Sequence, residues 1–79
     1  MTTPSPNPSG RGARLVRLSF NPSSDSTVDA IKSAAAALID QIDQLDVDDV
    51  DDLRARALAV THIETGAMFA VKAATATKP

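Results

Sequence analysis

Cysteine, tryptophan and tyrosine are absent from this chain of 79 residues, and two phenylalanines are its whole aromatic content. Without cysteine, disulfide bonds, thiolate metal sites and thiol chemistry are excluded. The single histidine, His62, argues against a zinc site within one chain, because such sites usually take several His or Cys ligands. We therefore expect a core of aliphatic side chains, with no metal and no cofactor.

Long hydrophobic runs and an excess of basic residues are also missing. No apolar run approaches the ~20 residues that cross a membrane, and residues 1–9 lack the positive charge followed by an apolar stretch that marks a signal peptide. The net charge is −2, whereas a nucleic-acid binder normally shows a strongly basic face. We expect a cytoplasmic protein that binds neither a membrane nor a DNA or RNA polymer.

The beginning of the chain predicts little regular structure. Its prolines and glycines predict a disordered tail over residues 1–13. Residues 14–20 alternate apolar and polar side chains, which is a weak strand signal. Since no second strand is available to pair with this segment, we expect an extended arm that packs on helices and stops at Asn21 and Pro22.

Residues 14–79 are predicted to form one all-α domain, an antiparallel helical hairpin preceded by the arm. The first helix is expected over about residues 27–45, capped by Ser26, with apolar residues in steps of three and four: Val28, Ile31, Ala35, Leu38, Ile42 and Leu45. The second is expected over about residues 50–76, capped by Asp48 or Asp49. Its residues in the same steps of three and four, here called its seam, are Val50, Leu53, Ala57, Val60, Glu64, Ala67, Val71 and Ala74. A connection this short makes the two helices antiparallel neighbours.

The second helix has more apolar surface than one neighbouring helix can cover. A second stripe, made mostly of small residues, comprises Ala59, Ile63, Gly66, Ala70 and Ala73, and it is extended by Met68 and Phe69. A helix that is apolar nearly all round must be buried, and a chain this short is marginally stable alone. We expect a compact homo-oligomer in which other copies cover this surface.

Two acidic features have a structural and a functional interpretation. The aspartate-rich residues 40–52 lack the glycine and the bidentate glutamate of a calcium loop, so we interpret them as a solvated turn with capping residues. Glu64 interrupts the seam, and a buried carboxylate needs a donor or a cation, such as Lys32, Arg17, Thr61 or a backbone N–H of the arm. Glu64 either fixes the helix register or orients a ligand-binding lysine.

The middle of the second helix leaves alternatives open as well. His62 is either a surface or interface histidine or a ligand contact across an oligomer interface, and no serine, cysteine or second acid forms a catalytic set with it. Gly66 costs about 1 kcal/mol relative to alanine in a helix. Close helix packing or a ligand near the backbone would offset that cost.

The most informative group is Phe20, Asn21 and Lys32. Phe20 is either a plug of the core or a platform for a nucleobase, since stacking on an aromatic face contributes ~1–3 kcal/mol per base. The amide of Asn21 suits the edge of a base. Lys32 lies one turn into the first helix and can reach a phosphate as a point charge.

The segments RLSFNPSSDSTVDAIKSAAAALIDQID and RARALAVTHIETGAMFAVKAATA together resemble a known family. They are similar to the helical-hairpin domain of phage nucleotide sponges that antagonise CBASS immunity, a hairpin that the larger Thoeris-antagonising sponges share. The resemblance covers residues 17–76. It implies a compact oligomer, typically a homohexamer, that binds cyclic dinucleotides and in some members cyclic trinucleotides at a separate site, without catalysis.

The resemblance also implies roles for particular residues. Phe20 would stack on a base beside Asn21, and Lys32 would contact a phosphate. The second site would involve Thr65, Gly66 and His62, matched by region. Arg17 completes the set of candidate ligand-binding residues.

The expected function is therefore the sequestration of cyclic oligonucleotide immune signals in the cytoplasm of an infected bacterial host. The signal would stay uncleaved, and CBASS-type defence would be blocked. The alternative is a small helical protein–protein interaction module, such as an adaptor or an antitoxin-like inhibitor. An enzyme is not expected, because no catalytic constellation is visible.

Overall fold

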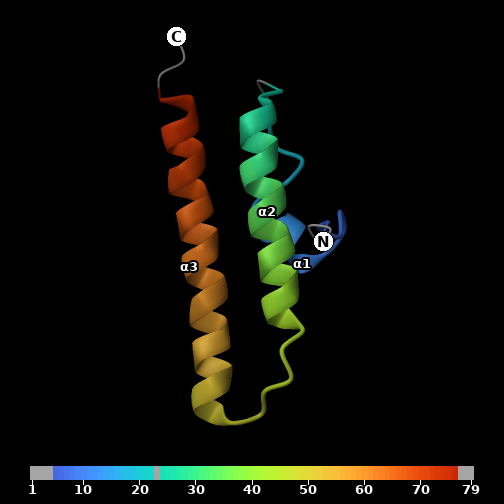
Figure 1. Ribbon diagram of the computed structural model, residues 1–79, viewed down its shortest axis with the longest axis vertical. Helices are drawn as coiled ribbons and strands as arrows, with labels where there is room; N and C mark the ends of the chain where they lie inside the picture. Colours follow the sequence, from blue (N-terminus) through green and yellow to red (C-terminus); the bar gives the residue numbers. More distant parts are fainter. Residues whose placement is uncertain (1–4, 23, 77–79) are drawn as a thin grey trace.

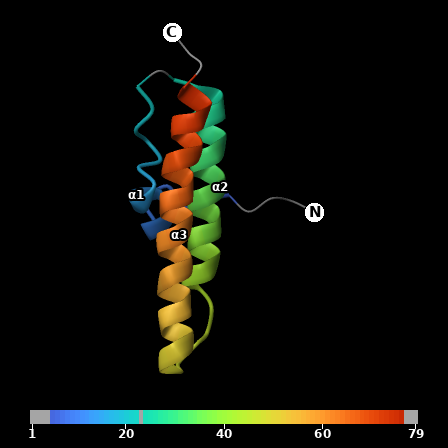
Figure 2. The same ribbon diagram turned by 90° about the vertical axis from the view of Figure 1, so that its left-hand side faces the viewer.

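A computed structural model describes residues 5–22 and 24–76, and within them it contains three helices and no strand. These are α1 (Arg11–Leu15), α2 (Ser26–Asp43) and α3 (Val50–Thr75). The long helices α2 and α3 lie antiparallel, and α1 packs across the middle of α2 (Figure 1). The second view shows α1 to one side of the plane that α2 and α3 define (Figure 2). The expected all-helical hairpin is confirmed.

The predicted arm is wrong at its start, because residues 11–15 form α1 instead of an extended segment. The expected tail boundary after residue 13 therefore falls inside a helix, and the tail's residues 1–4 lie outside the described part of the chain. An unpaired strand would leave its backbone groups without partners, whereas a helical turn bonds them locally. Gly12 and Ala13 are buried against α2, so tertiary packing supplies the stability that so short a helix lacks.

The ends of the long helices follow from their capping residues. Asp25 caps α2 by accepting a hydrogen bond from the Thr27 N–H at 2.9 Å, so the cap lies one residue before the expected Ser26. Asp49 caps α3 by accepting from the Asp51 N–H at 3.0 Å, which confirms one of the two predicted caps. Asp51 and Asp52 occupy the first turn of α3, where the helix dipole favours negative charge.

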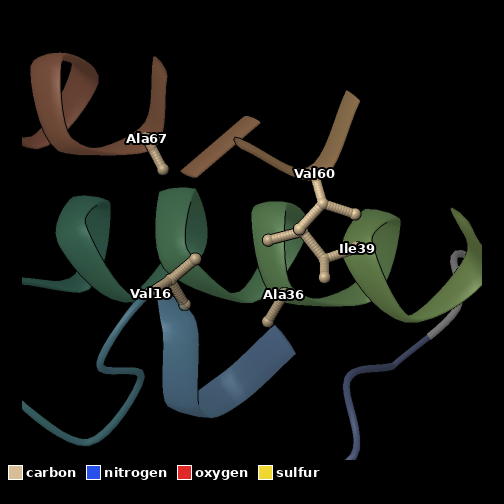
Figure 3. Close-up of a cluster of buried hydrophobic side chains, with 5 residues drawn as sticks. All are labelled: Val16, Ala36, Ile39, Val60 and Ala67. Atoms are coloured by element: carbon tan, nitrogen blue, oxygen red, sulfur yellow. The ribbon is translucent and has the colours of Figure 1, made fainter. Parts of the chain in front are cut away.

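The buried core joins the end of α1 to both long helices (Figure 3). It comprises Val16, Ala36, Ile39, Val60 and Ala67, and Ile39 is its largest fully buried side chain. The predicted seam of α2 is displaced from this core: Leu38 and Leu45 are exposed, whereas Ile39, which is not part of the predicted seam, is fully buried. The reason is that α2 has two neighbours on different faces, so its buried positions serve α1 as well as α3.

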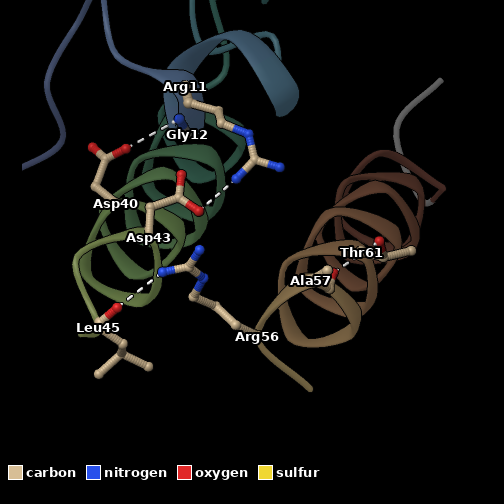
Figure 4. A network of polar contacts seen from close by, with 8 residues as sticks. All are labelled: Arg11, Gly12, Asp40, Asp43, Leu45, Arg56, Ala57 and Thr61. Atoms are coloured by element: carbon tan, nitrogen blue, oxygen red, sulfur yellow. Dashed lines mark hydrogen bonds and ion pairs between the residues drawn. The ribbon is translucent and has the colours of Figure 1, made fainter. Parts of the chain in front are cut away.

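Polar contacts attach α1 and the connection to the hairpin (Figure 4). Asp40 accepts a hydrogen bond from the Gly12 N–H at 3.0 Å, and Arg11 forms an ion pair with Asp43. The guanidinium of Arg56 on α3 donates to the Leu45 carbonyl oxygen at 2.9 Å. These bonds give structural partners to residues of the aspartate-rich segment and fix the start of α1 on α2.

One face of α3 stays exposed in the single chain. Leu58, Met68 and Phe69 are large apolar residues with 43%, 63% and 58% of their surface accessible. No helix in the described ranges has the length and apolarity needed to cross a membrane.

Candidate ligand-binding site

The site begins with the turn that ends α1. The Leu18 N–H donates to the Ala13 carbonyl oxygen at 2.9 Å and the Arg17 N–H to that of Arg14 at 3.2 Å, which is the hydrogen-bond pattern of a Schellman motif. Arg17 occupies the left-handed position with φ 53°, where glycine is usual and another residue costs roughly 1–2 kcal/mol. The turn sends residues 18–20 back along α2 and brings Leu18 against the core.

Lys32 of α2 holds this loop in place. Its side chain is 8% exposed, and its ammonium group donates to the carbonyl oxygens of Arg17, at 3.0 Å, and of Phe20. The same nitrogen lies 5.5 Å from the centre of the Phe20 ring, within the range of a cation–π interaction. Since no carboxylate pairs with Lys32 among the described residues, its charge is stabilised by carbonyl dipoles and an aromatic ring, all of them neutral groups.

A groove of about 600 Å³ opens beside Lys32, between the loop, α2 and α3. This volume lies within the about 300–1,000 Å³ of small-molecule sites. The end of α1 and its loop contribute Leu15, Val16, Arg17 and Phe20, α2 contributes Lys32, and α3 contributes Glu64, Thr65, Ala67, Met68 and Val71. The groove thus combines two cations, a hydroxyl group and a ring that is 60% exposed with an apolar floor.

Glu64 faces the groove without the partner expected for it. Both ammonium bonds of Lys32 go to carbonyl oxygens, and the Thr61 hydroxyl donates to the Ala57 carbonyl oxygen at 3.1 Å. Within the described chain, no hydrogen bond or ion pair links Glu64 to Lys32, Arg17 or Thr61. Glu64 therefore adds a negative charge to the groove and does not orient the lysine.

Asn21 lies outside the groove, although it adjoins Phe20 in sequence. Its amide nitrogen donates to the Asp25 carbonyl oxygen at 2.7 Å and to the Asp29 carboxylate at 2.9 Å, and its amide oxygen accepts from the Asp25 N–H at 3.2 Å. The side chain organises the turn that leads into α2, so both donors of its amide are already engaged.

The three candidate ligand-binding residues on α3 do not all line the groove. Thr65 lines the groove, whereas His62 and Gly66 are exposed and outside it. A Cβ atom added at Gly66 would meet nothing within 4 Å. The structure therefore brings Arg17, Phe20, Lys32 and Thr65 together and leaves Asn21, His62 and Gly66 apart.

Met68 and Val71 also line the groove, although neither was among the predicted site residues. Both lie on the Glu64 side of α3, at the i+4 and i+7 positions that share one helix face. That spacing relative to Glu64 was a usable signal, but Met68 had been assigned only to the surplus apolar surface.

The fold and the groove define a helical-hairpin protein with a groove between its hairpin and an N-terminal loop. The model of the Acb2/Tad1 hairpin domain matches residues 13–75, most of the chain, and the protein belongs to this family of anti-CBASS sponges. The family is known for binding cyclic oligonucleotide signals, and its members are sponge-type binders rather than enzymes. No curated protein and no solved structure matches the chain.

Proposed function

We propose that this protein sequesters cyclic dinucleotides, with cyclic trinucleotides as a second ligand class, and so blocks CBASS-type defence in the cytoplasm of an infected bacterium. The observation that carries the proposal is the groove in which an exposed aromatic ring adjoins a buried lysine that pairs with no carboxylate of the described chain. A compact ring of bases and phosphates is complementary to that combination. The family to which the chain belongs supports the same ligand class.

Each groove residue has a role that follows from its chemistry. Phe20 stacks on a base, and its large exposed fraction leaves ring surface free for this contact. Lys32 has three N–H groups, of which two hold the loop, so one remains to donate to a phosphate oxygen. Arg17 adds a second cation, and the Thr65 hydroxyl can donate to or accept from the ligand.

Capture without chemistry is part of the proposal. Among the described residues that line the groove, Glu64 is the one carboxylate, and His62 does not line the groove. An acid without a second acid or a base beside it does not assemble a hydrolytic set. Binding at micromolar or tighter affinity suffices to lower the free signal.

We also propose that the protein works as a homo-oligomer, with a hexamer as the expected form. Leu58, Met68 and Phe69 are exposed on α3, and exposed apolar patches mark interaction surfaces. A Cβ atom added at Gly66 would meet nothing within 4 Å, so no close packing in the described part of the chain offsets the helix-destabilising effect of this glycine, and a closely packed second copy would offset it. Sites at such interfaces would place His62, Thr65 and Gly66 near a ligand.

A release experiment tests the proposal. Purified protein is incubated with 3′,3′-cyclic GMP–AMP or cyclic tri-AMP and heat-denatured, and the released nucleotide is analysed by chromatography and mass spectrometry. Unmodified nucleotide in an amount equal to that bound is expected. Linear or hydrolysed product would overturn the sponge function.

Two variants assign the binding to the groove. Phe20→Ala should weaken binding roughly tenfold, because a stacking contact contributes ~1–3 kcal/mol, and the exposed position of Phe20 leaves the fold intact. Lys32→Met keeps the aliphatic stem and removes the charge, so binding should fall at least as much. Arg54→Ala, an exposed position on α3 outside the groove, is the control and should bind as the wild type does.

The alternative function, a helical protein–protein interaction module, is supported by the same exposed residues of α3. Ligand binding raises the unfolding temperature of a protein, so a thermal-shift screen with cyclic di- and trinucleotides separates the two functions. No stabilisation by any cyclic nucleotide would favour the interaction module.

A further inference from the structure

A second groove adjoins the loop that carries Phe20. Its volume is about 460 Å³, and its wall includes Arg14, Arg17 and Phe20. None of the described residues on this wall is acidic, unlike the first groove with its Glu64. Although the chain is net acidic, two guanidinium groups line this second groove, and no carboxylate is among its described lining residues.

The two arginines keep most of their hydrogen-bond donors free. One guanidinium nitrogen of Arg14 donates to the Ser9 carbonyl oxygen at 3.2 Å, which ties the side chain to the segment before α1. Arg17 has no hydrogen bond from its guanidinium within the described chain, and both side chains are exposed. A guanidinium has five N–H donors in a planar fork that matches phosphate oxygens. The two positively charged guanidinium groups in this groove repel each other, and an anion bound between them offsets that repulsion.

The two grooves share part of their walls, because Arg17 and Phe20 line both. A cyclic dinucleotide has two phosphates held apart by its ring. Because Phe20 lines both grooves, one phosphate can face Lys32 in the first groove while the other faces Arg14 in the second.

We propose that Arg14 is a ligand-binding residue that clamps the second phosphate of the cyclic nucleotide, with Arg17 shared between both phosphates. This inference rests on the proposed function and adds a residue and a groove to it. It makes the loop at residues 17–20 a ridge that the ligand straddles, so a nucleotide with one phosphate can satisfy only one side. The protein therefore selects for two phosphates in one molecule.

Isothermal titration with 3′,3′-cyclic GMP–AMP at low and high ionic strength tests the clamp, with AMP as the single-phosphate probe. Arg14→Gln should weaken binding of the cyclic nucleotide roughly tenfold or more at low salt, because a hydrogen bond to a charged group contributes about 1.5–3 kcal/mol. The loss should shrink at high salt, since salt screens exposed charges. Arg14→Lys should retain more affinity than Arg14→Gln, and Arg54→Gln should bind as the wild type does.

The outcomes separate this inference from the proposed function. If the wild type binds the cyclic nucleotide and Arg14→Gln binds equally well, the clamp is wrong and the sponge function stands. A loss that is the same at both ionic strengths and is not reduced in Arg14→Lys would assign Arg14 a structural role through Ser9, which also overturns the clamp. If the wild type binds no cyclic di- or trinucleotide, the proposed function fails and the clamp fails with it.

Discussion

Gly12 lies at a close approach of the backbones of α1 and α2. A Cβ atom at this position would lie 2.2 Å from the Ala36 carbonyl oxygen, which is backbone that cannot move aside alone. We expect Gly12→Ala to lower the free energy of unfolding by about 1–3 kcal/mol, equivalent to several degrees in melting temperature for a chain of this size. Thermal unfolding followed by circular dichroism measures it. Ala55→Gln, an exposed change on α3, is the control, and equal melting temperatures for the two variants would contradict the close approach.

Replacing Arg17 is expected to weaken ligand binding without lowering the stability of the fold. Its left-handed backbone costs roughly 1–2 kcal/mol relative to glycine, and its side chain lines both grooves. We expect Arg17→Gly to melt at the same temperature as the wild type or higher, and to bind 3′,3′-cyclic GMP–AMP roughly tenfold more weakly because a charged contact is lost. Calorimetry and titration on the same sample measure both quantities. A variant that melts lower but binds normally would show that Arg17 acts only in folding.

At the scale of elements, the Asp40 carboxylate of α2 is expected to stabilise the packing of α1 against α2. Its carboxylate accepts from the Gly12 N–H at 3.0 Å and from the Asn7 N–H at 3.2 Å, so it ties both α1 and the segment before α1 to α2. We expect Asp40→Ala to cost about 1–3 kcal/mol and to raise hydrogen exchange in residues 12–18 while α2 and α3 stay protected. Asp48→Ala, in the exposed connection, is the matched control. Uniform loss of protection in all three helices would mean that α1 does not unfold as a separate unit.

The three helices also show how far the sequence predicts this fold. The long helices were predicted within two residues of their observed ends, because apolar spacing and aspartate caps are local signals. The short helix α1 was missed: Gly12 lowers its helix propensity, and its stability comes from contacts with Asp40 and Ala36 that are distant in sequence. The burial of Ile39 in place of Leu38 has the same origin, since it depends on α1 covering a second face of α2.

The candidate site was predictable in part for the same reason. Phe20 and Lys32 are brought together as their chemistry suggested, because one lies just before α2 and the other on its second turn. The use of Lys32 to bind carbonyl oxygens could not be predicted, since it requires the left-handed turn at Arg17. Asn21 was assigned to a base edge, but Asp25 and Asp29, its partners nearby in sequence, engage its amide instead.

On the scale of the whole molecule, the exposed face of α3 predicts association. We expect light scattering to give a mass several times that of the chain, and Phe69→Lys to reduce it while the helix content persists, because a buried charge without a partner is strongly unfavourable. Asp46→Lys adds the same cation in the connection between the helices and should leave the mass unchanged. A monomeric wild type that still binds cyclic nucleotide would contradict the proposed oligomer but not the proposed binding in the groove.

The position of Lys32 has a consequence for the speed of capture. Its ammonium group loses most of its water when the chain folds, and the loop carbonyls fix its direction before any ligand arrives. An incoming anion therefore meets a dehydrated and oriented charge, and little of the protein has to rearrange. If the protein binds cyclic nucleotides as proposed, their uptake should then be limited by diffusion and electrostatic attraction, as the proposed competition with a defence effector requires.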